Sequence, residues 1–420
     1  MKTLFINARN ESGERFDMLV DGAKFVKIAS NIAPKDYVDA KVVDLDAKLV
    51  LSPFVDPHIH LDYVYTAFDP RAKNNSGTLF EGIARWSETK GKLTKQEIKD
   101  RAKIAVKKEI LHGTQYIRTH VDVTDPKLTA FEAMMELKDE IKDILTLQII
   151  AFPQEGMYAY KDGDELVEKA VSLGADVVGG IPHFEYSREM GEKSVHRLVD
   201  IAVKYNKLID VHCDETDDPN SRYLELLANL SLDAGLLDKT TASHTCAMGS
   251  YDNAYAFKLM KLLKASKINI IACPTENLHL QGRYDNYPKR RGLTRIKELN
   301  DNGINVCFAQ DSISDPWYPL GNGSLLAQLD FGIHAGHMMS IEEINKVFAL
   351  ITTNGAKTLH LGDSYGIKEG NAANFIVLDA GSAWEAIQER VATIASVRNG
   401  EYLFKTEPVI RSFSDKMSCL

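Results

Sequence analysis

Short apolar segments alternate with amphipathic helical patterns through most of this chain. Between residues 51 and 364, eight such segments have the length and composition of β-strands. They are the run that ends at His58 and residues 116–123, 144–152, 176–182, 208–212, 240–244, 268–273 and 304–309. Regular alternation of strands and helices predicts an α/β fold with a parallel sheet, and eight repeats predict a closed (β/α)8 barrel of the TIM type.

Two helices carry a start signal that can be identified locally. Thr94 and Glu97 have the spacing of a capping box, in which each side chain bonds the backbone of the other residue. Ser340 and Glu343 repeat the same spacing. The second box predicts a helix that continues through residues 344–350.

Both ends of the chain have the pattern of short β-hairpins. Residues 16–20 and 24–28 flank Asp21-Gly22, and residues 395–398 and 401–404 flank Asn399-Gly400. Both dipeptides favour tight hairpin turns. With a further strand at residues 374–378, the two ends are expected to form one small β-sandwich module. The expected domains are therefore residues 1–50 plus 365–420 for this module, and 51–364 for the barrel.

Composition narrows the class of protein. The 420 residues carry 50 basic and 59 acidic side chains, a net charge of -9, which argues against a nucleic-acid-binding surface. The sequence contains neither a signal-peptide pattern at its start nor an apolar run of membrane-spanning length. We expect a cytoplasmic protein without a membrane partner. Five scattered cysteines without C-x-x-C spacing predict buried free thiols.

Two histidines, His58 and His60, stand one residue apart at the end of the first barrel strand. Side chains at i and i+2 of a strand share one face, so both rings are expected to point the same way. Paired imidazoles of this kind suit a divalent metal ion. The same pair could instead be two hydrogen-bonded histidines at a strand end, and only ligands from other strands distinguish the two interpretations.

Such ligands stand at the ends of other predicted strands, where barrel enzymes place their reactive residues. His212 ends the fifth strand and Asp311 follows the eighth. With His58 and His60 they predict a shell of three histidines and one carboxylate around a single ion, with a position open for water.

Further polar residues lie close to this predicted shell. Glu215 follows His212 by three residues and is a candidate proton shuttle, although it could be an exposed loop acid. His244 ends the sixth strand and is a candidate to orient or polarise the attacking water, or a core histidine. His120 and Asp122 share one strand face and are interpreted as a supporting hydrogen-bonded pair, in preference to ligands of a second metal ion.

Several longer motifs resemble the amidohydrolase superfamily, and more closely its cytosine deaminases. The likeness covers nearly the whole chain. The motifs are Pro57-His58-Ile59-His60-Leu61-Asp62, Ser76-Gly77-Thr78-Leu79-Phe80-Glu81-Gly82, Phe152-Pro153-Gln154-Glu155-Gly156, Val211-His212-Cys213-Asp214-Glu215, Leu278-His279-Leu280-Gln281-Gly282-Arg283 and Asp315-Pro316-Trp317-Tyr318-Pro319-Leu320-Gly321.

The resemblance implies roles for particular residues. His58, His60, His212 and Asp311 would hold one Fe2+ or Zn2+ ion, since residues 176–182 lack the lysine with which two-metal members often bridge their ions. Gln154 would hydrogen-bond the edge of a pyrimidine, the Leu79 backbone would face the ring, and Trp317 would line the pocket. The substrate would be a small nucleobase, and relatives suggest a homo-oligomer.

The expected reaction is hydrolytic deamination, with Glu215, His244 and Asp311 as the catalytic residues. One departure bears on the substrate: the cytosine deaminases usually have a second aspartate after the metal aspartate, and here that residue is Ser312. Loss of a charged, bulky group beside pyrimidine C5 predicts that 5-methylcytosine is accepted at least as readily as cytosine. Ser312 could also be a tolerated variant in a cytosine deaminase. Gln310 also departs from the pattern and receives no role.

Other activities are also open. Another cyclic amidine, such as isocytosine or isoguanine, could be the substrate of the same metal chemistry. A non-catalytic scaffold is the alternative from a different class, although a scaffold has no use for the complete set of ligands together with Glu215 and His244.

Overall fold

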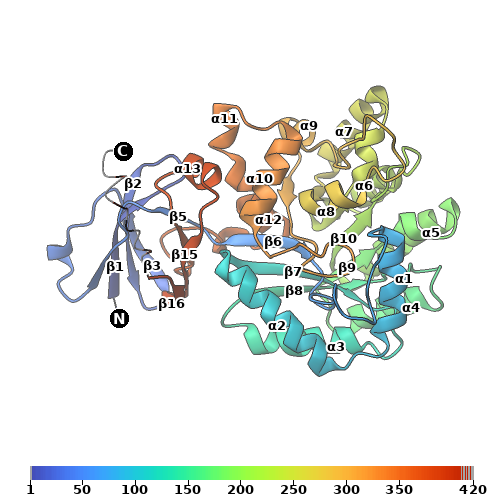
Figure 1. Ribbon diagram of the computed structural model, residues 1–420, viewed down its shortest axis with the longest axis horizontal. Helices are drawn as coiled ribbons and strands as arrows, with labels where there is room; N and C mark the ends of the chain where they lie inside the picture. The colour runs from blue at the N-terminus through green and yellow to red at the C-terminus, as the bar shows by residue number, and fades with distance from the viewer. Residues whose placement is uncertain (1, 408, 410–411, 413, 415–416, 418–420) are drawn as a thin grey trace. The chain divides into compact units, whose positions relative to one another are not determined.

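The computed structural model describes residues 2–407, 409, 412, 414 and 417 (Figure 1). The chain divides into two compact units. One consists of Met1–Leu51, Ile367–Ala386 and Val391–Leu420, and the other of Ser52–Gly366 with Ile387–Arg390.

The larger unit contains the predicted barrel. Its eight strands pair in chain order, each parallel to the next: β6 (Phe54–Ile59), β7 (Thr114–Asp122), β8 (Thr146–Phe152), β9 (Val177–Gly180), β10 (Leu208–Cys213), β11 (Thr240–His244), β12 (Asn269–Ala272) and β13 (Val306–Phe308). A parallel bridge between Ile59 and Asp311 connects the last strand region to the first. The barrel prediction is confirmed.

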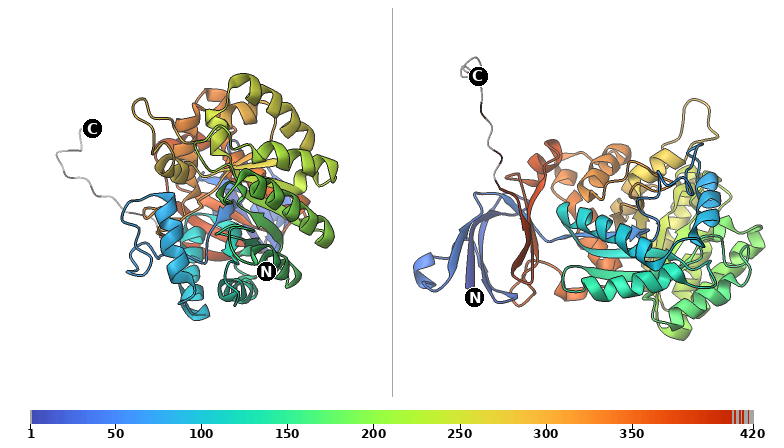
Figure 2. Two further views of the ribbon diagram at one scale, coloured as in Figure 1. Left: turned by 90° about the vertical axis from the view of Figure 1, so that its right-hand side faces the viewer. Right: turned by 60° about the horizontal axis from the view of Figure 1, so that its bottom comes forward.

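Helices surround these strands (Figure 2). They are α1 (Leu79–Lys90), α2 (Lys95–Leu111), α3 (Thr129–Ile141), α4 (Gly163–Ser172), α5 (Arg188–Tyr205), α6 (Tyr223–Asp233), α7 (Asn253–Ser266), α8 (Pro274–Leu280), α9 (Ile296–Asp301), α10 (Leu325–Gly336), α11 (Ile341–Ile344) and α12 (Thr353–Thr358). Every residue of β7 is buried, as expected of a parallel strand covered on both faces.

Both predicted capping boxes form. Thr94 accepts from the backbone of Glu97, and Glu97 accepts in return. Ser340 and Glu343 do the same at the start of α11. The helix predicted over residues 344–350 is wrong, because α11 ends at Ile344 and a 3-10 helix, Val347–Ile351, follows. This tighter winding buries four of the five apolar residues of that segment, and burial outweighs continuation of the α-helix.

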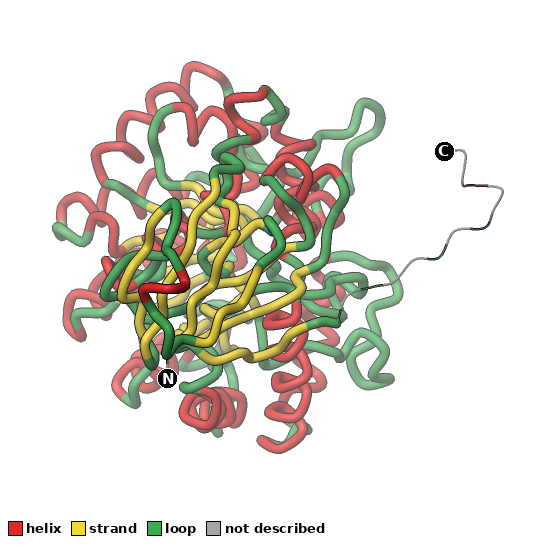
Figure 3. Tube along the Cα trace, turned by 90° about the vertical axis from the view of Figure 1, so that its left-hand side faces the viewer, coloured by secondary structure: helices red, strands yellow, loops and turns green. Residues whose placement is uncertain are grey.

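The smaller unit is an eight-stranded mixed sheet built from both ends of the chain (Figure 3). Its strands are β1 (Lys2–Arg9), β2 (Arg15–Asp21), β3 (Lys24–Ala29), β4 (Lys41–Asp44), β5 (Leu49–Leu51), β14 (Phe375–Leu378), β15 (Thr393–Arg398) and β16 (Glu401–Lys405). Antiparallel pairing of β5 with β14 joins the two ends. The structure differs from a sandwich in one respect, since hydrogen bonds connect all eight strands into one sheet.

Both predicted hairpin turns are present in this unit. Asp21 pairs with Lys24, and Arg398 pairs with Glu401. Asn399 and Gly400 have φ angles of 52° and 80°, the left-handed conformation that a two-residue hairpin turn of this type requires.

Four cysteines, Cys213, Cys246, Cys273 and Cys307, are buried free thiols as predicted, and Cys419 lies outside the described residues. In the described part of the chain, no helix combines the length and apolarity needed to cross a membrane.

Candidate active site and metal centre

The strand pairing that closes the barrel also brings the first and last predicted ligands together. The Asp311 backbone N–H donates to the His58 carbonyl at 2.8 Å, and the His60 N–H donates to the Asp311 carbonyl at 3.1 Å. These bonds place the Asp311 side chain beside both rings. Its Oδ1 lies 3.4 Å from His58 Nε2 and 3.6 Å from His60 Nε2.

His212 completes the set from the opposite side of the barrel. Its Nε2 lies 3.0 Å from Nε2 of His60, and potential ligand atoms of His58, His60 and His212 all lie within 4.8 Å of one another. Ligands at about 2.1 Å from one ion are separated by about 3.4 Å in tetrahedral geometry. The observed separations and the partnerless His58 Nε2 fit a single divalent ion.

A chain of hydrogen bonds fixes the tautomer of His58. Asp210 can only accept when ionised, so the Ser243 hydroxyl donates to it at 2.7 Å. The Ser243 oxygen then accepts from His58 Nδ1 at 2.9 Å, which leaves Nε2 without a proton and free to bind a metal. Arg118 holds Asp210 in place through a bond of 3.1 Å.

Electrostatics keep the predicted ligands in the protonation states that metal binding requires. Burial, reinforced by neighbouring imidazoles, holds the pKa of His60 and of His212 well below the usual value, so both rings are neutral. Burial opposes ionisation of Asp311, but the adjacent His58 and His244 outweigh it and lower the pKa of this carboxyl group. Neutral imidazoles and an ionised carboxylate are the metal-binding forms.

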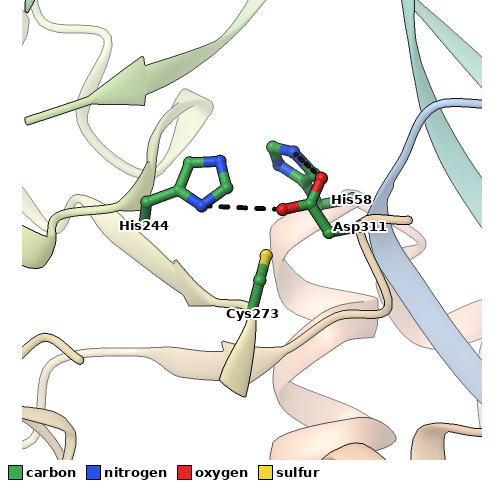
Figure 4. A group of neighbouring side chains, drawn as sticks. All are labelled: His58, His244, Cys273 and Asp311. Atoms are coloured by element: carbon green, nitrogen blue, oxygen red, sulfur yellow. Dashed lines mark ion pairs between the residues drawn. The ribbon is translucent and has the colours of Figure 1, made fainter. Parts of the chain in front are cut away.

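His244 and Glu215 lie next to this ligand cluster. His244 Nδ1 is 3.8 Å from Glu215 Oε1 and 3.7 Å from Asp311 Oδ2 (Figure 4 shows the latter contact). It also faces the side-chain amide nitrogen of Asn277 at 3.1 Å, and the Asn277 oxygen accepts from the Cys273 backbone. Nδ1 therefore accepts a hydrogen bond, and the proton of the neutral ring sits on Nε2, which has no partner within the protein.

Burial has opposite effects on these two groups. It lowers the pKa of His244 to about 3, and together with the charge of Asp311 it raises the pKa of Glu215 well above the ordinary value. His244 is thus a neutral hydrogen-bond donor. Glu215 is a carboxyl group able to carry a proton near neutral pH. Both His244 and Asp311 have left-handed backbones, with φ of 68° and 65°, a strained conformation frequent at functional sites.

A cavity opens directly onto these residues. The four residues that the sequence assigned to substrate binding, Leu79, Gln154, Ser312 and Trp317, all line it, as do Glu215 and His244. Gln154 is buried, and its Oε1 has no hydrogen-bond partner within the protein.

The cavity residues are held by the elements that carry them. Leu79 begins α1, where the Thr78 side chain caps the helix. The Trp317 ring packs on Tyr63 with ring centroids 4.4 Å apart. A Cβ atom on Gly82 of α1 would approach the Trp317 ring to 2.6 Å, so only glycine allows α1 to lie this close.

A family model described as "Amidohydrolase family" matches residues 41–404. The chain belongs to the amidohydrolase family. This confirms the resemblance found in the sequence motifs.

The amidohydrolase is similar to several characterised proteins over nearly its full length. A solved 5-methylcytosine deaminase from Klebsiella pneumoniae, liganded with 5-fluorocytosine, is 48% identical with a TM-score of 0.94, covering 98% of this chain and 99% of that one. N-isopropylammelide isopropyl amidohydrolase of Pseudomonas sp. (strain ADP) is 26% identical over 411 residues, 96% of each chain. The solved N-isopropylammelide isopropylaminohydrolase of Burkholderia multivorans ATCC 17616, 22% identical with a TM-score of 0.83 over 97% of this chain and 99% of that one, supports the fold alone.

A third acid lines the cavity of the amidohydrolase besides Glu215 and Asp311, and the sequence did not predict its role. Glu276 on α8 is buried, lines the cavity, and has one oxygen, Oε2, without a partner. Burial first, and then the charges of Asp311 and Asp315, raise its pKa well above the ordinary value, while the nearby Ser312 hydroxyl opposes that rise. The sequence did contain a signal for Glu276, because this acidic residue comes just after a predicted strand. Asp311 was identified from the same kind of position.

The predicted pairing of His120 with Asp122 is wrong. Neither ring nitrogen of His120 has a hydrogen-bond partner, and the ring lies against His58 with centroids 4.0 Å apart. Asp122 instead accepts from Trp86 at 2.9 Å and from Lys90 at 3.0 Å. A charged lysine and an indole N–H on α1 are stronger partners for a buried carboxylate than a neutral imidazole.

Gln310, to which the sequence assigned no role, supports Ser312 in the amidohydrolase. Its side-chain amide donates to the Ser312 carbonyl at 2.8 Å, and its backbone N–H donates to Asp56 at 3.2 Å. These bonds fix the loop that follows Asp311.

Proposed function

We propose that this amidohydrolase is a metal-dependent hydrolytic deaminase of aminopyrimidines that converts cytosine and 5-methylcytosine to uracil and thymine with release of ammonia. The observation that carries the proposal is the convergence of His58, His60, His212 and Asp311 beside a buried cavity that also holds Glu215 and His244. The 48% identity with a 5-methylcytosine deaminase supports the choice of substrate.

His58, His60, His212 and Asp311 would hold one Fe2+ or Zn2+ ion. When bound, such an ion would lower the pKa of water to about 7, so that hydroxide is available at neutral pH. The protein's part is to orient the four ligands and to move protons.

Glu215 would move those protons. Its raised pKa suits a group that takes a proton from water and gives it to ring nitrogen N3, which makes C4 electrophilic. The free Nε2–H of His244 would donate a hydrogen bond to the attacking oxygen. Once the water oxygen has bonded to C4, Glu215 and Asp311 would move the remaining proton of that oxygen to the amino group. The C4–N bond then breaks, ammonia leaves, and a carbonyl group remains at C4.

Three residues would position the ring. Gln154 offers an oxygen that lacks a partner inside the protein to the polar edge of the pyrimidine, and the Leu79 backbone would face the ring. Trp317, supported by Tyr63, would form one wall. Buried polar groups that pair only with substrate discriminate strongly against analogues that leave them unpaired.

Ser312 would admit the 5-methyl group. A serine in place of an aspartate removes a charge and frees volume next to C5, and a methyl group in a fitted pocket contributes about 1–3 kcal/mol. Glu276 also lines the cavity, but its raised pKa keeps its carboxyl group protonated. It therefore does not replace the negative charge that an aspartate at position 312 would carry.

Rates with the two bases test this proposal. We expect kcat/KM for 5-methylcytosine to equal or exceed that for cytosine, and Ser312→Asp to shift the preference toward cytosine by roughly 10- to 200-fold. A preference of the unaltered enzyme for cytosine of about tenfold or more, left unchanged by Ser312→Asp, would contradict the assignment.

Cytoplasmic location and homo-oligomeric assembly remain predictions. Size-exclusion chromatography with light scattering tests the second.

A further inference from the structure

A second group of potential metal ligands overlaps the catalytic set. His58, His244, Cys273 and Asp311 are all buried, and ligand atoms of the four lie within 4.8 Å of one another. Cys273 directly follows β12 and precedes α8. Figure 4 shows its thiol pointing toward the space between His244 and Asp311.

Two further observations point to a ligand in this space. Nε2 of His58 is buried without a hydrogen-bond partner and lies 3.4 Å from Asp311 Oδ1, and Nδ1 of His244 lies 3.7 Å from Asp311 Oδ2. Both rings are at most 1% exposed. Buried polar atoms without partners are rare in folded proteins unless they bind something.

The two ligand groups cannot both be complete at the same time. His58 Nδ1 is engaged by Ser243, so His58 has only Nε2 to offer, and one nitrogen lone pair binds one ion. His58 and Asp311 belong to both groups. The positions are therefore alternatives for a single ion, and in the second one His244 becomes a ligand.

We propose that His58, His244, Cys273 and Asp311 form an alternative, non-productive position for a thiophilic divalent cation such as Cd2+ or excess Zn2+. Thiolate sulfur selects soft ions, whereas imidazole and carboxylate also accept harder ones such as Fe2+. On binding, the Cys273 S–H proton is released to solvent and a sulfur–metal bond forms, without a change of oxidation state.

The consequence for activity rests on the proposed deaminase function. An ion in this position takes the Nδ1 lone pair of His244, which otherwise accepts from Asn277, and it also takes the Asp311 carboxylate, which the catalytic ion requires. Thiophilic ions should therefore inhibit the enzyme by taking ligands from the catalytic ion.

Titration of the purified holoenzyme with CdCl2 tests the site. We expect a thiolate-to-cadmium charge-transfer absorption that saturates at one Cd2+ per chain, loss of the resident ion, and loss of ammonia release from cytosine. Total bound metal should stay at one ion per chain. Two ions bound per chain at saturation would contradict the claim that the two positions share His58 and cannot be filled together.

Variants of two buried cysteines provide the comparison. Cys307 is a matched control, because it is equally buried but its sulfur contacts Thr358 and the Ile270 carbonyl. Cys273→Ala should abolish the absorption, and Cys307→Ala should retain it. Loss of a residue that only supports a metal ligand weakens metal binding by about 10- to 100-fold. Loss of a ligand itself should weaken it at least as much. The Cd2+ concentration that halves activity should therefore rise at least about tenfold in Cys273→Ala.

The outcomes separate this site from the proposed function. Absence of the absorption in the unaltered protein, or its persistence in Cys273→Ala, overturns the site even when the protein deaminates cytosine. Saturable absorption that depends on Cys273 supports the site even when no aminopyrimidine is turned over. Cys273→Ser, which keeps the size of the side chain but lacks the soft sulfur, should behave as Cys273→Ala does.

Discussion

At the scale of single residues, the site depends on protons held in particular places. His58 binds a metal only if its proton stays on Nδ1, and Ser243 ensures this because its own hydroxyl hydrogen is committed to Asp210. Sequence alone could not reveal this relay. It joins side chains from β6, β10 and β11 whose contact depends on strand register, whereas each predicted ligand could be recognised from its own position at a strand end.

Removing the Ser243 hydroxyl should weaken metal binding. Ser243→Ala leaves His58 free to move its proton to Nε2, and loss of such a partner costs about 10- to 100-fold in metal affinity. Competition with a chelator measures the change, and excess metal should restore ammonia release. Ser266→Ala removes a buried serine hydroxyl from α7 and serves as the control. Equal affinities in the two variants would refute the relay.

Glu215 should be required for turnover and not for metal retention. Glu215→Gln keeps the size of the side chain but cannot carry a proton, and proton transfer by a positioned group contributes about 10²- to 10⁴-fold to rate. We expect kcat to fall by that factor while one ion per chain remains bound. A kcat within a few fold of the unaltered enzyme would remove Glu215 from the reaction.

Asp62 should make stability depend on pH. Burial raises its pKa to about 8, so between its unfolded value and pH 8 the folded chain holds a proton that the unfolded chain has lost. The free energy of unfolding should therefore fall with rising pH in this window, by about 1.4 kcal/mol per unit for one proton. Asp62→Asn lacks this contribution. Urea unfolding from pH 5 to 8 should give a shallower pH slope for the variant, and parallel curves would disprove the assignment.

At the scale of elements, α1 links the cavity to two strand ends. Leu79 at its start lines the cavity, and Lys90 at its end pairs with Asp122 of β7 and with Glu155, the residue after Gln154. Asp122 and Glu155 raise the pKa of Lys90 although burial opposes them. These two ion pairs therefore connect the helix that begins at Leu79 to the end of β7 and to the segment that carries Gln154.

Breaking that link should affect both stability and substrate binding. Lys90→Met leaves a buried carboxylate without its cation, which typically costs 3–5 kcal/mol. We expect the free energy of unfolding to fall by about that amount and KM to rise more than kcat falls. The exposed neighbour Lys92 gives the control, because Lys92→Met should change neither quantity. Identical behaviour of the two variants would show that Lys90 does not position α1.

The elements that the sequence predicted correctly are those whose signals are local. The capping boxes at Thr94 and Ser340 and the turns at Asp21-Gly22 and Asn399-Gly400 depend on residues within a few positions of each other. The helix over residues 344–350 failed because its winding is decided by burial against distant elements. Glu276 was missed because its importance follows from its place beside Ser312, which lies 36 positions away in the chain.

At the scale of the whole molecule, the barrel unit contains every residue of the proposed site, and the sheet built from both chain ends contributes none of them. Three of the eight parallel strands, β6, β10 and β13, bring the predicted ligands from different parts of the sequence to one end of the barrel. The bridge that joins Ile59 to Asp311 then holds the first and last of them together. Catalysis in this account requires one ion bound by the residues at these three strand ends.

Metal removal tests that requirement most directly. Protein dialysed against a chelator should release no ammonia from 5-methylcytosine, and one equivalent of Fe2+ or Zn2+ should restore turnover. Protein in which His212 is replaced by alanine should not recover. Undiminished turnover by metal-free protein would contradict the account.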